Sequence, residues 1–80
     1  MTLIEAIIKR IYEICSDRKI TLNKLSTICG ITQSTLNNIV SGKSLNPSVS
    51  TIKKICDGVE IDLSDFFDTE YFKNLEQEIK

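Results

Sequence analysis

The sequence predicts an all-helical fold, a compact bundle of about five short helices with an extra helix at the C-terminus. Apolar residues recur three and four positions apart along nearly the whole chain, as they do on the buried face of a helix. The alternation of apolar and polar residues that marks a strand is missing, and only three Gly and one Pro interrupt the 80 residues. A chain of this length forms one domain with a thin core.

The first helix is expected from about Leu3 to Ser16. Thr2 and Glu5 have the spacing of a capping box, in which each side chain binds the backbone N–H of the other residue. The predicted buried face of this helix consists of Ile4, Ile7, Ile8, Ile11, Ile14 and Cys15.

The second and third helices are short and follow each other closely. The second is expected to start after Thr21 and to end at Gly30, and the third to start after Thr32 and to run to about Ser41, before Gly42. Their predicted inward-facing residues are Leu22, Leu25, Ile28, Cys29, Leu36, Ile39 and Val40.

A polar loop, residues 43–47, separates these helices from a fourth. Ser48 is the expected N-cap of the fourth helix, Gly58 lies near its end, and Asp62 is the cap of a short fifth helix. The predicted inward-facing residues of the fourth helix are Val49, Ile52, Ile55, Cys56 and Val59.

The last segment of the chain predicts a further, acidic helix. Its apolar residues have the spacing of a single helical stripe, and they are Tyr71, Phe72, Leu75 and Ile79. This stripe packs either as a lid on the core of its own chain or against a second copy in a homodimer. We therefore divide the chain into a domain at residues 1–67 and a C-terminal helical extension at residues 68–80.

Composition excludes several classes of protein. His is absent and the three Cys lack the paired spacing of a zinc site, so no metal site, no cofactor and no catalytic residues are predicted, and the thiols are expected to be reduced core residues. No apolar run approaches the ~20 residues that span a bilayer, and the first residues do not resemble a signal peptide. The expected location is the cytoplasm, without membrane contact.

The net charge of −1 hides an uneven distribution. Residues 1–56 contain eight Lys or Arg and three Asp or Glu, a net charge of +5, whereas residues 57–80 contain two basic and eight acidic residues, a net charge of −6. A basic body with an acidic end suits a protein that approaches nucleic acid with one face only.

Residues 21–42 have the pattern of a helix-turn-helix, two short helices joined around Gly30. The outer face of the second of these helices carries neutral hydrogen-bonding side chains and no Lys, Arg or Glu. Gln and Asn can bind the edge of adenine in the major groove, and a Thr methyl can touch that of thymine. The predicted base-reading residues are Gln33, Ser34, Thr35 and Asn38. The predicted phosphate contacts are Thr21, Asn37, Ser41, Lys43, Ser44 and Asn46.

Over residues 3–67 the sequence resembles the phage-repressor and Cro-like helix-turn-helix domains, also called the XRE family. The matching residues are Thr21, Leu25, Ser26, the run from Gly30 to Leu36, Ile39, Gly42, Lys43, the run from Asn46 to Ser48 and the run from Cys56 to Val59. The resemblance implies a lambda-repressor-like bundle whose third helix enters the major groove, usually from a dimer on two half-sites. It also implies that Gln33, Ser34 and Asn38 read bases and that Thr21, Asn37 and Lys43 contact phosphates.

Three positions depart from the family pattern. Leu22 stands where members often carry a phosphate-binding Gln, so one contact to the DNA backbone is expected to be missing. Cys15 and Val40 stand where members frequently have an Arg and a Glu, so that an apolar contact replaces a buried ion pair. Ser26 replaces a frequent Ala and keeps the side chain small.

The predicted function is sequence-specific binding of double-stranded DNA by a transcriptional regulator that acts as a repressor. The alternative is a protein-interaction module on the same scaffold, such as an antitoxin-like or anti-repressor partner. An enzyme is disfavoured because the sequence offers no combination of nucleophile, base or metal ligands.

Overall fold

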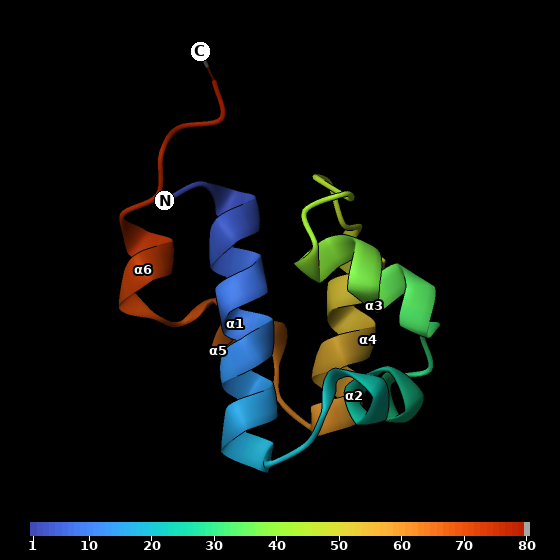
Figure 1. The fold of residues 1–80 in the computed structure, drawn as a ribbon. Coiled ribbons are helices and arrows are strands. Elements are labelled where there is room, and N and C mark those ends of the chain that lie inside the picture. Colours follow the sequence, from blue (N-terminus) through green and yellow to red (C-terminus); the bar gives the residue numbers. More distant parts are fainter. Residues whose placement is uncertain (80) are drawn as a thin grey trace.

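The computed structural model describes residues 1–79, and in that range every regular element is a helix (Figure 1). The helices are α1 Leu3–Arg18, α2 Leu22–Cys29, α3 Gln33–Val40, α4 Val49–Val59, α5 Leu63–Phe67 and α6 Glu70–Lys73. The predicted all-helical fold is confirmed. Within the described range, no helix is both long and apolar enough to cross a membrane.

The helices start where their capping residues predict. Each of α1 to α4 follows a Thr or Ser in extended conformation, whose hydroxyl oxygen accepts a hydrogen bond from the backbone N–H three positions later. These caps are Thr2, Thr21, Thr32 and Ser48. The capping box of α1 is complete, because the Glu5 carboxylate accepts the N–H of Thr2 at 2.8 Å.

Three of the helices end in the left-handed backbone conformation. α2 does so at Gly30, with φ of 68°, as the sequence predicts. α1 and α4 end the same way at Lys19, with φ of 55°, and at Glu60, with φ of 61°. Since a Cβ is crowded in this conformation, both residues carry backbone strain that glycine would avoid.

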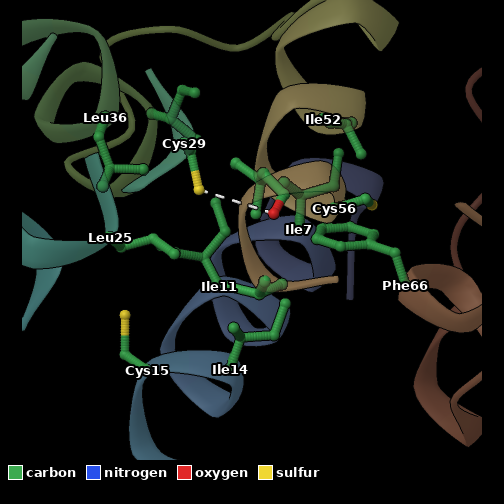
Figure 2. Close-up of a cluster of buried hydrophobic side chains, with 13 residues drawn as sticks. Ile7, Ile11, Ile14, Cys15, Leu25, Cys29, Leu36, Ile52, Cys56 and Phe66 are labelled. Carbon is green, nitrogen blue, oxygen red and sulfur yellow. Dashed lines mark hydrogen bonds between the residues drawn. The ribbon is translucent and has the colours of Figure 1, made fainter. Parts of the chain in front are cut away.

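A single core joins α1, α2, α3, α4 and α5 (Figure 2). Its most enclosed side chains are Ile11, Leu25, Leu36, Ile55, Cys56 and Phe66. α2 lies against α4, and the thiol of Cys29 donates a hydrogen bond to the Ile55 carbonyl oxygen at 3.6 Å. Gly58 lies inside α4, near its end as predicted, and faces Cys29, so its missing side chain permits close helix packing, whereas the helix itself ends at Glu60.

Two residues that were predicted to face inward are exposed instead. Val49 is 71% exposed and Ile28 is 43% exposed, whereas the small Ser26 is buried. The apolar spacing identifies which face of a helix is buried, but it does not show how far the neighbouring helices extend along that face. Val49 is the first residue of α4, at the end of the helix. Ser26 is accommodated in the interior because its hydroxyl donates to the Asn23 carbonyl oxygen at 2.7 Å.

The three cysteines are free thiols and all are buried, as predicted. Figure 2 shows Cys29 directed at α4, with Cys15 and Cys56 in the same core. Burial, reinforced by the other two thiol groups, raises the pKa of the Cys29 thiol from 9.0 to about 11. A buried thiol that keeps its proton is a poor nucleophile and metal ligand.

The C-terminal helix is shorter than the apolar spacing predicts. α6 ends at Lys73, and residues 74–79 are not helical. The Asn74 side chain donates to the Glu70 carbonyl oxygen at 3.3 Å, which is the oxygen that the next helical N–H would use. Ile79, predicted to lie on the stripe, is 87% exposed. Lys80, the last residue of the predicted extension, lies outside the described residues.

The first half of this extension forms a lid on its own chain. The ring centroids of Phe66 and Phe72 are 6.2 Å apart, and Phe72 packs against the core. The Tyr71 hydroxyl donates to the carboxylate of Glu13 on α1, and the Lys9 amine lies 4.6 Å from the centroid of the Tyr71 ring. Of the two roles that the sequence left open for the stripe, these residues take that of the lid.

Candidate nucleic-acid interface

α2 and α3 form the predicted helix-turn-helix. After the left-handed Gly30, the N–H of Ile31 donates to the Ser26 carbonyl oxygen at 3.1 Å, which closes the turn. Leu25 of α2 and Leu36 of α3 are fully buried in the common core, so the two helices are held at a fixed angle. The turn therefore presents α3 as a rigid element at the surface.

The outward face of α3 is free of internal contacts. Gln33, Ser34, Asn37 and Asn38 are all exposed, and none of their side chains has a hydrogen-bonding partner within residues 1–79. Figure 1 shows α3 on the opposite side of α1 from α6, so the lid leaves this face uncovered. The donors and acceptors of these four side chains are available to a ligand.

Thr35 has a structural role that its sequence position did not reveal. Its N–H donates to the hydroxyl oxygen of Thr32 at 3.1 Å, and the two hydroxyl oxygens lie 2.9 Å apart. The Thr35 hydroxyl thus forms part of the N-cap of α3, and its methyl group is the part left for a ligand. Ser48 and Thr51 form the same pair at the start of α4, also at 2.9 Å.

The loop between α3 and α4 folds back on the end of α3. The N–H of Ser44 donates to the Asn38 carbonyl oxygen at 2.9 Å, and the Ser41 hydroxyl donates to the same oxygen at 3.4 Å. Lys43 and Asn46 are exposed in this loop. The loop residues predicted to contact phosphate thus gather beside the C-terminal end of the exposed helix.

Thr21 lies apart from this loop, at the start of α2. Its hydroxyl oxygen accepts the N–H of Lys24 at 3.1 Å, and both residues are exposed. Lys24 is a cation in the first turn of α2 that the predicted contacts did not include, and its position three residues after a helix cap was the available signal. Leu22 between them is partly buried against the core, which explains an apolar residue there.

The cations nearest the exposed helix are not neutralised by the rest of the protein. Among residues 1–79, neither Lys24 nor Lys43 has an ion-pair partner, whereas Lys53 pairs with Asp57 on α4. Arg10 is also engaged, since its Nε donates to the Phe66 carbonyl oxygen at 2.8 Å. Lys24 and Lys43 therefore leave unpaired positive charge on the helix-turn-helix and its following loop.

Comparison with known proteins gives the class. The chain belongs to the Cro/C1-type HTH DNA-binding domain family, which it matches over residues 10–71. It is 36% identical over 64 residues to the HTH-type transcriptional regulator SlrR of Bacillus subtilis (strain 168), covering 79% of this chain and 42% of that protein. The chain thus spans less than half the length of this relative.

The fold has a counterpart among crystal structures. The prophage Lp1 protein 11 superposes with a TM-score of 0.82 at 31% sequence identity, over 94% of this chain and 99% of that chain. The predicted resemblance to phage-repressor-like domains is thereby confirmed. The protein is a Cro/C1-type DNA-binding domain related to a transcriptional regulator.

Proposed function

We propose that the protein is a sequence-specific transcriptional regulator, acting as a repressor, that inserts α3 into the major groove of duplex DNA. The observation that carries this proposal is the exposed row of amide and hydroxyl groups on α3, whose Gln33, Ser34, Asn37 and Asn38 side chains have no hydrogen-bonding partner within residues 1–79. A rigid helix with such a face can bind base edges without first breaking internal hydrogen bonds. Duplex DNA as the ligand also implies a cytoplasmic location.

The proposed base contacts follow from side-chain chemistry. Gln33 and Asn38 can each bind the N6 and N7 edge of adenine with two hydrogen bonds, and Ser34 can donate or accept. Thr35 would contribute its methyl group, because its hydroxyl is engaged with Thr32. We expect these residues to favour a site that contains A·T pairs.

Phosphate contacts would fix the position of α3 in the groove. We assign them to Lys43 as the charged group, with Lys24 added from its place beside the Thr21 cap. The remaining contacts are those expected from the sequence, Thr21, Asn37, Ser41, Ser44 and Asn46. Such contacts bind all sequences alike and make affinity depend on salt.

We also propose that two copies bind one site as a homodimer, since helix-turn-helix domains commonly read two half-sites one DNA turn apart. The first half of the extension already packs on its own chain through Phe72, so Leu75 and Ile79 are the apolar residues of the extension that we assign to a second copy.

The experiment that tests the proposal is selection of binding sites from a pool of random duplexes at stated salt, combined with sedimentation of the complex. We expect enrichment of a palindromic site and a mass of two protein chains. A protein-interaction module on the same scaffold would enrich no sequence. Failure to bind any duplex at low salt would rule out the regulator.

A further inference from the structure

The segment that follows α6 returns to the start of α1. We call residues 74–79 the acidic tail. The N–H of Glu76 donates to the Met1 carbonyl oxygen at 3.1 Å, and the Glu76 carboxylate lies 3.3 Å from the Met1 ammonium group. Figure 1 shows the tail passing the N-terminus beyond α6. These two contacts set the course of the tail at this end of the molecule.

The tail and the α3–α4 loop line the same groove. This groove has a volume of about 470 Å³, and its walls include Leu3 and Ile7 of α1, Asn46 and Pro47 of the loop, and Glu78 of the tail. Glu78 and part of the loop that we assign to phosphate contacts therefore border one groove. Within the described chain, the Glu78 carboxylate has no ion-pair partner, whereas the Glu76 carboxylate is paired.

We infer that the acidic tail is an autoinhibitory segment, which lowers the affinity of the domain for DNA by holding the negative charge of Glu78 in the groove that the phosphate-binding loop also lines. The inference rests on the function proposed above. A duplex that contacts Asn46 and Lys43 brings phosphates to the edge of the groove that Glu78 lines, and like charges within about one Debye length, 8–10 Å, repel each other.

The attachment of the tail suits a regulatory segment better than a permanent part of the core. The Met1–Glu76 ion pair is exposed, and exposed ion pairs contribute little to stability. Ile79 beyond Glu78 is uncovered, so no buried apolar contact secures the end of the described tail. The tail can therefore move away when phosphates approach, at a small cost in free energy that reduces the affinity.

The test compares two variants that each remove one negative charge and keep the shape of the side chain. Glu78→Gln changes the groove, whereas Glu70→Gln changes an exposed residue of α6, on the far side of α1 from α3. The dissociation constant of each variant and of the wild type is measured on one mixed-sequence duplex over a range of salt. Thermal unfolding confirms that both variants keep the fold.

We expect Glu78→Gln to bind about two- to fourfold more tightly than wild type at about 50 mM salt, with the gain disappearing towards about 0.5 M as the charges are screened. Glu70→Gln should bind like wild type. Equal affinities for all three proteins, or an equal gain for both variants, would overturn the inference and leave the proposed function intact. Absence of binding by every protein, wild type included, would overturn both.

Discussion

Gly58 of α4 lies directly against Cys29 of α2, so that a Cβ at residue 58 would be 2.5 Å from the Cys29 sulfur and 2.9 Å from its Cα. α2 is the helix that supports α3 through the turn at Gly30. The absence of a side chain at residue 58 therefore fixes how closely α4 approaches the helix-turn-helix, and with it the position of the exposed face of α3.

Gly58→Ala is expected to destabilise the protein. Alanine favours a helix over glycine by about 1 kcal/mol, but overpacking of a well-filled contact costs about 1–3 kcal/mol. Because backbone atoms of Cys29 form part of the contact, we expect a net loss of about 1–2 kcal/mol in the free energy of unfolding, measured by urea denaturation. A more stable variant would show that α2 and α4 separate at no cost.

Lys19→Gly and Glu60→Gly should have the opposite effect. Both residues are exposed and have positive φ at the ends of α1 and α4. Glycine relieves the crowding of Cβ but increases the entropy of the unfolded chain, so we expect each variant to gain about 0.5 kcal/mol. Urea midpoints measure the change, and Gly42→Ala, which introduces a Cβ at φ of 83°, is the reverse control. If Gly42→Ala were the most stable of the three variants, positive φ would not be the cause of strain at Lys19 and Glu60.

Asn38→Ala should reduce recognition of the selected site while leaving the fold intact. Its side chain is exposed and unpartnered within residues 1–79, so its loss removes only contacts to DNA. We expect a loss of about 1–3 kcal/mol on the selected site and little change on a scrambled duplex. Asn37→Ala is the matched control, since a phosphate contact is lost on both duplexes alike. If Asn38→Ala lost equal binding free energy on the two duplexes, Asn38 would be a contact to the DNA phosphates and not to the bases.

Lys43→Ala should weaken binding on every sequence and reduce its dependence on salt. Removing one cation that contacts a phosphate lowers the slope of log affinity against log salt by about one unit. Lys9→Ala is the control, because the Lys9 amine lies over the Tyr71 ring on the α6 side of the molecule. The slope is measured from binding at several salt concentrations. A slope for Lys43→Ala equal to that of wild type would contradict the assignment of Lys43 to a phosphate.

The protein should lose stability in alkaline solution. Burial raises the pKa of Cys29 to about 11, and burial together with the hydrogen bond to Glu13 raises the pKa of Tyr71 to about 12. Both groups keep their protons longer in the folded state, so their contributions are complete below about pH 9 and disappear as the pH rises towards 12. The urea midpoint should fall over this range, and Cys29→Ala should flatten its first part. A midpoint that stays constant up to pH 12 would contradict both shifts.

The starts of α1 to α4 could be predicted because capping is local. A hydroxyl and the N–H three residues later are set close by the backbone itself, as at Thr21 and Lys24. The outward face of α3 could be predicted for the same reason, since Leu36 and Ile39 identify the buried side and the polar residues must lie opposite.

Other features depend on residues far apart in the sequence. The packing role of Gly58 could not be predicted, because it depends on the contact with Cys29 in another helix. The early end of the C-terminal helix also depends on such contacts: the Asn74 side chain binds the Glu70 carbonyl oxygen, and the tail binds Met1. Thr35 illustrates a limit within one helix, because a hydroxyl at this position fits both a cap and a base contact. The folded structure assigns the Thr35 hydroxyl to the cap, through its contact with Thr32.

The enclosed thiols offer a practical consequence. Since Cys15, Cys29 and Cys56 are shielded by the packed helices, an alkylating reagent can reach them only when those helices separate. The rate of alkylation therefore reports how often the native domain opens, and a bound duplex that steadies the helix-turn-helix should slow it, which gives a readout of occupancy that needs no label on the nucleic acid.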